Sequence, residues 1–200
     1  MSFASSQFVI CLTGMPGAGK STVAAFLKEK GFFIITMGDV IRDKAKEKNL
    51  PLDDKSLGEL MKDFRRTHGN DIIANLTMKR IKEFKDKCLV VVDGIRSYDE
   101  FKVLKSTGFV KLLAIHAASN IRYGHIINRE RSDTPANHEN FLQRDEREMN
   151  VGISKAIALA DESISNNNLT INELKLQVET IIEKWLHEYN NSDLNNKVSK

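Results

Sequence analysis

The chain has 200 residues, of which 41% are hydrophobic and 28% are charged, and its formal net charge at pH 7 is +3. This length and composition are typical of one globular domain that buries a hydrophobic core. The small net charge, without a basic run interleaved with aromatic residues, argues against an extended nucleic-acid-binding surface. The apolar run near the N-terminus is too short for a signal peptide or a membrane span, so we expect a cytoplasmic protein.

Cys11 and Cys88 both fall in predicted buried strands, and their spacing matches no metal site. We expect them to be small buried side chains in a reducing compartment, and a disulfide is the alternative. The 5 histidines share no spacing with one another or with cysteine and acidic residues, so we expect no catalytic or metal role for them.

The first predicted strand, residues 8–13, is followed directly by the segment GMPGAGKS at 14–21. This segment matches the phosphate-binding pattern G-x-x-x-x-G-K-[ST] at every fixed position. Its glycines allow the backbone dihedrals with which successive N–H groups converge on one phosphate. Lys20 supplies a charge for the outer phosphates, and the Ser21 hydroxyl is placed to ligate Mg²⁺. A glycine turn in another kind of strand–helix unit is the alternative interpretation.

The helix that follows, predicted over 21–30, adds its positive N-terminal end to this site. We therefore predict that one continuous segment binds the phosphates of a nucleotide. Its residues are Gly14, Met15, Pro16, Gly17, Ala18, Gly19, Lys20, Ser21 and Thr22.

Further apolar runs predict strands at 32–36, 88–92 and 111–116, and residues 160–166 offer a weaker fifth strand. Each of the stronger runs is continuously apolar, as expected of a strand that is covered on both faces. Helical stretches separate the runs, which indicates a parallel sheet with helices on both sides. The last helix begins at a capping box formed by Thr170 and Glu173.

About fifty residues, mostly charged, separate the second and third predicted strands, which is too long for a plain crossover. Ser56 and Glu59 form a capping box for a helix that ends at Gly69, and another helix follows. We therefore predict a helical insertion at about 40–87, beside the phosphate loop. A segment dense in arginine and acidic residues follows the fourth strand, at about 122–148. Residues 1–190 would form one domain, and the polar tail at 191–200 would be disordered.

Ligands of an open parallel sheet bind outside the carboxyl ends of its strands. Asp93 ends the third strand, where it would ligate Mg²⁺ or a metal-bound water, and a local turn bond to the backbone is the alternative. Asp39 follows the second strand as a general base or metal-water ligand, or as the N-cap of a helix at 40–48. Arg96 and Arg42 would face the same pocket, where planar cations suit a phosphate, unless they are solvated surface residues.

The segment 122–148 contains a cluster of arginines, namely Arg129, Arg131, Arg144 and Arg147. Phosphoryl transfer needs cations on the migrating group, and a mobile segment commonly supplies them. We favour this role for Arg131, whereas the pattern RDERE at 144–148 is also typical of an exposed, salt-bridged helix. Glu100 could contact an acceptor, but Ser97 and Glu100 also form a capping box, which we favour.

The segments GMPGAGKS at 14–21, MGDVIR at 37–42, VVDGIR at 91–96 and RERSD at 129–133 resemble, in order and spacing, those of adenylate kinase and related nucleoside monophosphate kinases. ADESISNNNLTINEL at 160–174 resembles the end of dephospho-coenzyme A kinases. Over roughly residues 7–186, the chain most closely resembles a largely archaeal P-loop nucleotide-binding family related to these kinases. The first motif is highly specific, and the later ones are moderately so.

The resemblance implies that Arg42 and Arg96 hold the phosphate of the acceptor and that Arg131 and Arg144 contact the transferred phosphoryl group. The insertion would bind the acceptor, and the backbone around 166–168 would border the adenine of ATP. The turn at 93–96 is one residue shorter than in the kinases and lacks their proline. Glu100 replaces the glutamine that reads the acceptor's adenine, and an ionised carboxylate has no donor for that base, which argues against AMP.

We predict a three-layer P-loop NTPase fold with a five-stranded parallel sheet, a helical acceptor-binding insertion and a short arginine lid. The protein would bind ATP and Mg²⁺, the metal through Ser21 and Asp93, and transfer the γ-phosphoryl group to a small acceptor resembling a nucleotide or dephospho-coenzyme A. Asp39 would act as base toward an alcohol, or serve the metal if the acceptor is a phosphate. The alternative function is an NTP-hydrolysing switch or assembly factor that binds a protein partner. The predicted catalytic residues are Lys20, Asp39, Arg96, Arg131 and Arg144.

Overall fold

The computed structural model describes residues 7–84, 89–129 and 135–198. Its centre is a five-stranded sheet with the strand order β2-β3-β1-β4-β5, in which every neighbouring pair is parallel. The predicted parallel sheet, including the weak fifth strand, is confirmed. The strands are β1 (Gln7–Thr13), β2 (Phe33–Thr36), β3 (Leu89–Ile95), β4 (Gly108–His116) and β5 (Glu162–Ser165).

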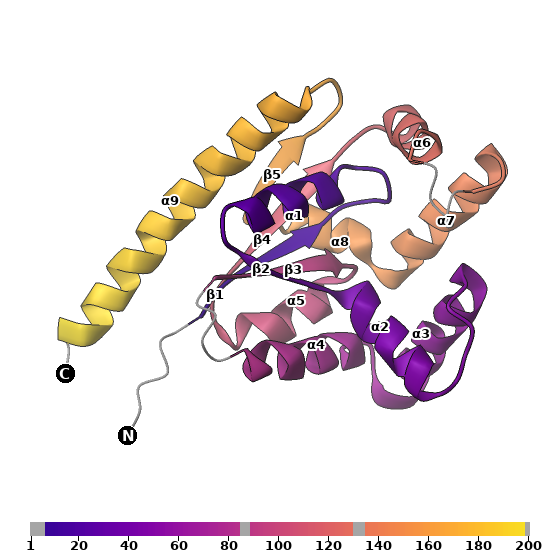
Figure 1. Ribbon diagram of the computed structural model, residues 1–200, viewed down its shortest axis with the longest axis horizontal. Coiled ribbons are helices and arrows are strands. Elements are labelled where there is room, and N and C mark those ends of the chain that lie inside the picture. The colour runs from indigo at the N-terminus through magenta and orange to yellow at the C-terminus, as the bar shows by residue number, and fades with distance from the viewer. Residues whose placement is uncertain (1–6, 85–88, 130–134, 199–200) are drawn as a thin grey trace.

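Helices cover both faces of this sheet (Figure 1). α1 and α9 lie on one face, whereas α4 and α5 lie on the other. Within the described residues, no helix is both long and apolar enough to cross a membrane. The helices are α1 (Lys20–Glu29), α2 (Met37–Glu47), α3 (Asp54–His68), α4 (Ile72–Glu83), α5 (Tyr98–Lys105), α6 (Ser119–Ile127), α7 (His138–Val151), α8 (Ile153–Ala158) and α9 (Ile171–Val198).

The central strand β1 is buried on both of its faces, because alternate side chains of a strand point in opposite directions. Phe8, Ile10 and Leu12 join a cluster with residues of α1 and α9, whereas Val9 and Cys11 join a second cluster with residues of α2 to α5. A strand that is covered in this way needs apolar side chains at every position, which explains why its sequence does not alternate. Burial raises the pKa of the Cys11 thiol, as expected of an inert core cysteine.

β3 extends beyond its predicted carboxyl end. Cys88, which was expected to begin it, lies outside the described residues, and the strand continues to Ile95. The register with β1 shifts between Asp93 and Ile95, so that Gly94, with a φ of 102°, is an extra residue in the strand. Asp93 therefore lies within a paired strand rather than in a turn.

The predicted insertion consists of α2, α3 and α4, which contribute to the cluster that holds Val9. α2 begins at Met37, and its N-cap is Thr36, whose hydroxyl accepts from the backbone N–H of Asp39. Asp39 therefore lies in the first turn, and the alternative that it is the N-cap is wrong. α3 is capped by Asp53, which accepts from the backbone N–H of Ser56, so the predicted capping box that starts at Ser56 is also wrong.

The capping box at the start of α9 is confirmed, because Glu173 accepts from the N–H of Thr170 and donates its own N–H to the Thr170 hydroxyl. The helix then continues through Val198, so the expected disorder at 191–200 is wrong as far as that residue. Extending an existing helix adds backbone hydrogen bonds without a new nucleation cost, which lets a polar tail remain helical.

Trp185 on α9 is 1% exposed and belongs to the cluster that α9 and α1 form with the sheet. Trp185→Ala would leave a large cavity, so we expect it to lower the free energy of unfolding by about 3–5 kcal/mol. Trp185→Phe keeps most of the apolar volume and should cost clearly less. Guanidinium unfolding followed by circular dichroism measures both variants. An alanine variant as stable as the parent would show that α9 is not part of the core.

Candidate functional site

The predicted phosphate loop lies at the carboxyl end of β1 and leads into α1. Gly14 and Gly17 have φ angles of 143° and 83°, in the region that favours glycine. A Cβ atom at Gly14 would lie 2.1 Å from the carbonyl oxygen of Ile115, and one at Gly17 would lie 2.5 Å from that of Arg122. The loop therefore approaches the end of β4 and a turn of α6 more closely than any other residue type would permit.

Lys20 folds back over this loop, and its Nζ donates to the carbonyl oxygens of Gly14 (2.6 Å) and Met15 (3.2 Å). Burial lowers the pKa of its ammonium group to about 8, and the nearby carboxylates of Asp93 and Glu148 oppose that shift. Lys20 thus carries a charge that desolvation destabilises and that an anion such as a phosphate would stabilise.

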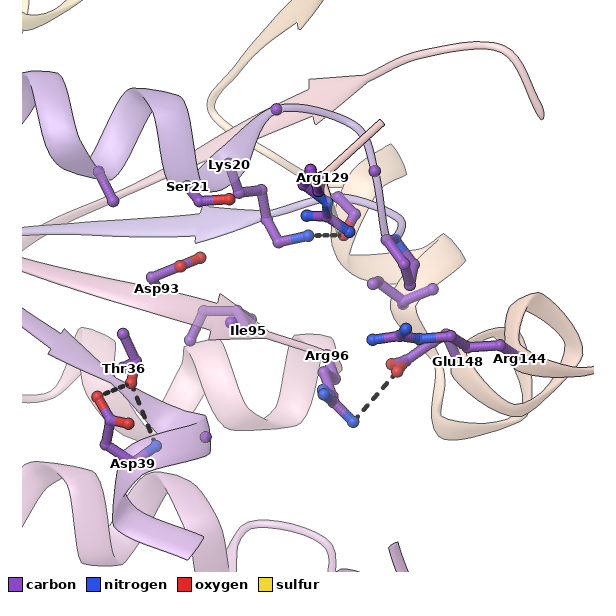
Figure 2. Close-up of a pocket in the computed structure, with 18 of the residues that line it drawn as sticks. Lys20, Ser21, Thr36, Asp39, Asp93, Ile95, Arg96, Arg129, Arg144 and Glu148 are labelled. Carbon is purple, nitrogen blue, oxygen red and sulfur yellow. Dashed lines mark hydrogen bonds and ion pairs between the residues drawn. The ribbon is translucent and has the colours of Figure 1, made fainter. Parts of the chain in front are cut away.

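A cleft of about 460 Å³ opens beside Lys20, at the carboxyl ends of β1, β2 and β3 and against α7 (Figure 2). This volume is within the range of small-molecule sites. Charged side chains from separate parts of the chain line it, namely Lys20, Asp39, Arg42, Asp93, Arg96, Arg129, Arg144 and Glu148. The structure thus brings the predicted catalytic residues together, apart from Arg131, which lies outside the described residues.

Most of the predicted phosphate-binding segment also lines this cleft, namely Gly14, Pro16, Gly17, Gly19, Lys20 and Ser21. Met15, Ala18 and Thr22 do not line it. Met15 contributes the carbonyl oxygen that Lys20 binds, and Ala18 is buried in the core.

Ser21 and Asp93 face each other across the cleft below α1 (Figure 2). Both offer hard oxygen ligands of the kind that Mg²⁺ prefers, and in nucleotide sites this ion takes one or two carboxylates together with phosphate oxygens and water. Within the described part of the chain, no group of three or more His, Cys, Asp or Glu side chains could hold a metal ion. The donor set therefore fits a Mg²⁺ ion that is held jointly with nucleotide phosphates.

Asp39 and Arg42 lie at the edge of the cleft, where about half of each side chain is exposed. One carboxylate oxygen of Asp39 accepts from Arg42 Nη1 at 2.5 Å, and the other accepts from the hydroxyl of Thr36. Both oxygens of Asp39 are thus engaged, and the two side chains form one polar unit at the start of α2.

The arginines of the predicted lid separate into those that reach the cleft and those that do not. Arg129 and Arg144 line the cleft, whereas Arg147 is exposed on α7. The sequence alone did not distinguish Arg129 from the other arginines of this segment. The direction of a side chain just after a helix depends on how that helix packs, and the local sequence does not give this packing.

The segment RDERE at 144–148 lies on α7 with its charges divided between two environments. Arg144 and Glu148, one helical turn apart, line the cleft, while Glu146 is exposed. Asp145 is 6% exposed and pairs with Arg122, which is 5% exposed. The interpretation of this segment as an exposed, salt-bridged helix is therefore wrong for its buried members. The spacing of four residues between Arg144 and Glu148 is the signal that could have identified the shared face.

Arg122 connects α7 to the phosphate loop. Its Nη1 donates to Asp145 Oδ1 at 2.9 Å and to the carbonyl oxygen of Pro16 at 3.1 Å, and its Nε donates to the carbonyl oxygen of Ala117 at 3.1 Å. One buried guanidinium group thus joins the loop, the end of β4 and the helix that carries Arg144. Nothing in the local sequence around Arg122 indicates this role.

The segment expected to border the adenine also supports the loop. Asn166 Nδ2 donates to the carbonyl oxygen of Ala18 at 2.9 Å, and Asn167 Oδ1 accepts from the N–H of Ala118 at 2.7 Å. His125 Nδ1 lies 2.9 Å from the carbonyl oxygen of Gly17. Asn166 and His125 thus contact two carbonyl groups of the phosphate loop, and Asn167 binds the backbone just after β4.

Glu100 is fully buried and forms the predicted capping box with Ser97. Its Oε2 accepts from the N–H groups of Arg96 and Ser97, and its Oε1 accepts from Arg65 Nη2 at 2.9 Å. Both carboxylate oxygens are thus used within the protein. This side chain positions the backbone of Arg96 and does not line the main cleft.

Comparison with known proteins supports this description of the fold. Residues 13–143 match the family model described as an AAA domain. A UPF0200 protein of Pyrococcus abyssi is 38% identical over 183 residues, which cover 90% of this chain and 97% of that protein. Among solved structures, shikimate kinase from Bacteroides thetaiotaomicron has a TM-score of 0.60 at 17% identity and covers 88% of this chain and 98% of its own. Shikimate kinase from Acinetobacter baumannii in complex with shikimate has a TM-score of 0.57 at 16% identity, covering 90% and 95%.

Arg122→Ala would leave the Asp145 carboxylate buried without its partner, so we expect the free energy of unfolding to fall by about 3–5 kcal/mol. Replacing both residues, as Arg122→Met with Asp145→Leu, should recover much of this loss because no buried charge remains. Asp99 and Lys102, each 57% exposed, form a surface pair of the same type, and Asp99→Ala should leave stability nearly unchanged. Urea unfolding compares the variants, and equal effects at the two pairs would contradict the structural role of Arg122.

Proposed function

Because this chain belongs to the UPF0200 family and shares the fold of P-loop kinases, we propose that it is an ATP-dependent phosphotransferase. The observation that carries the proposal is the extent of the cleft, which continues past Lys20 to a second set of cations. Arg144 of α7 and Arg129, just after α6, line it together with Arg42 of α2 and Arg96, just after β3. A nucleotide triphosphate alone does not need both sets, whereas transfer to a second anionic substrate does.

The chain would act by positioning and by neutralising charge rather than by covalent chemistry. The N–H groups of the loop at 14–22 and the ammonium group of Lys20 would hold the phosphates of ATP. Ser21 and Asp93 would hold a Mg²⁺ ion, which would supply positive charge to offset that of the phosphates. Arg144 and Arg131 would contact the transferred group, with Arg129 beside them.

The acceptor would be a small anion, resembling a nucleotide or dephospho-coenzyme A, whose charged group binds Arg42 and Arg96. Glu100 does not read a base, because Arg65 and the backbone occupy both of its oxygens. Asp39 would keep Arg42 in place and serve either a metal-bound water or the acceptor. The acceptor site would therefore not recognise a purine base through Glu100.

The proposal is tested by measuring ADP production from Mg·ATP with a panel of acceptors. The panel contains nucleoside monophosphates, nucleosides, dephospho-coenzyme A and shikimate, the last because it is bound in a structural neighbour. We expect at least one acceptor to raise ADP production by tenfold or more above the rate in water alone, and Lys20→Ala to abolish the increase. ATP turnover that no acceptor changes, together with co-purification of a protein, would favour the hydrolytic switch instead.

Binding of ATP should take up a proton at Lys20. Burial lowers the pKa of its ammonium group to about 8. The side chain is therefore mostly neutral at about pH 8.5, which is above this pKa, and mostly charged at about pH 7, which is below it. Phosphates favour the ammonium form and raise this pKa on binding. Calorimetric titration with Mg·ATP in buffers of different ionisation enthalpy should show uptake of more than half a proton near pH 8.5 and little near pH 7. The same uptake in Lys20→Met would assign the proton to another group and refute this account of Lys20.

A further inference from the structure

Glu148 on α7 is a buried carboxylate at the wall of the cleft. It is 7% exposed, and its Oε1 lies 3.2 Å from Arg96 Nη1. Its Oε2 is also buried and has no hydrogen-bond partner in the part of the chain that the structure describes. A buried carboxylate oxygen without a donor is costly, so this atom points to a donor group that arrives with a ligand.

The position of Glu148 separates it from the proposed metal site. Figure 2 shows Asp93 on the side of Ser21, whereas Glu148 lies on the side of Arg96 and Arg144. Two carboxylates therefore flank Lys20, one near the residues that would hold Mg²⁺ and one near those that would hold the acceptor. Both are close enough to act on the Lys20 ammonium group, as their opposition to its lowered pKa shows.

The charge of Glu148 restricts what can bind beside it. A phosphate oxygen of an acceptor would be repelled by a carboxylate in a buried setting, because like charges interact strongly where water is excluded. A hydroxyl group or a water molecule would instead donate a hydrogen bond to Oε2. Asp39 is less suited to this task, since Arg42 and Thr36 engage both of its oxygens and about half of it is exposed.

We propose that Glu148 receives the proton of the attacking nucleophile, and that this nucleophile is a hydroxyl group or water. The inference rests on the proposed phosphotransferase function and specifies its acceptor. As the hydroxyl oxygen attacks, a new bond forms to the γ-phosphorus, and the bond to the oxygen that bridges the β- and γ-phosphates breaks. The electron pair of that bond leaves with ADP, and the hydroxyl proton moves to Glu148 Oε2.

The acceptor class follows from this arrangement. Arg96 can contact both Glu148 and an acceptor, because its Nη1 lies 3.2 Å from Glu148 Oε1 while its side chain lines the cleft and is 32% exposed. An acceptor that fits would carry an anionic group for Arg96 and Arg42 and, some distance away, a hydroxyl group for Glu148. Phosphorylated or carboxylated alcohols meet both conditions, whereas a nucleoside monophosphate attacking through its phosphate does not.

The test compares Glu148→Gln with Glu146→Gln, an exposed glutamate on the same helix. ADP production is measured from Mg·ATP with water alone, with hydroxyl acceptors (nucleosides, shikimate and dephospho-coenzyme A) and with nucleoside monophosphates. We expect Glu148→Gln to slow the reaction with the active hydroxyl acceptor, and with water, by about 100-fold or more, which is the usual scale of general-base catalysis. Its affinity for ATP should stay within about twofold of the parent, and Glu146→Gln should match the parent in both respects.

A second variant tests whether Glu148 accepts a proton or only positions Arg96 through their ion pair. Glu148→Ala leaves space for a small carboxylate, so added formate should raise the rate of this variant by about tenfold or more. Chloride at equal ionic strength should not raise it. Unchanged activity of Glu148→Gln, absence of rescue by formate, or stimulation by nucleoside monophosphates alone would each overturn the inference while leaving the phosphotransferase function intact. A parent protein that binds ATP but forms no ADP with any probe would instead overturn the function itself, and the inference with it.

Discussion

The guanidinium group of Arg122 is the contact on which the geometry of the site depends. It is buried, it pairs with Asp145 of α7, and it donates to backbone carbonyl groups of the phosphate loop and of the segment after β4. A charge in such a place is tolerated only with its donors satisfied and its counter-ion present. The requirement fixes α7 against the loop, and α7 in turn places Arg144 and Glu148 at the cleft. The distance between the phosphate site and the lid side of the cleft is therefore a consequence of one buried ion pair.

Charge in the cleft is arranged around Lys20. Three carboxylates and several guanidinium groups line a space that is large enough for phosphates and a small second substrate. The carboxylates differ in their surroundings. Asp39 is about half exposed and both of its oxygens accept hydrogen bonds, Asp93 lies within β3, and Glu148 is buried on α7. Groups of the same chemistry acquire separate roles from such differences in solvation and partners. The shikimate kinases share only the fold at this level of identity, so the acceptor has to be argued from these side chains.

Features that depend on a few neighbouring residues were predictable from the sequence. The phosphate loop, the apolar strands and the capping boxes at Ser97 and Thr170 are set by backbone dihedrals and hydrogen bonds within one or two turns. The errors arose where several polar residues compete for one local role. Thr36 rather than Asp39 caps α2, and Asp53 rather than Ser56 caps α3, because the helix starts at the residue whose side chain first reaches an unpaired N–H group.

By itself, the sequence determined the parallel sheet, the loop that follows its central strand, and the edge of the sheet at which charged residues gather. Only the tertiary structure decided which of those residues share the cleft. Arg122 and Pro16 are 106 positions apart in the chain, and Arg122 and Asp145 are 23 apart, so no local pattern records their contact. The sequence around Glu148 is typical of an exposed charged helix, whereas in the structure the packing of α7 buries the face that carries Glu148. The direction of a side chain on a helix follows from the surface against which that helix packs, and this surface is made by segments distant in sequence.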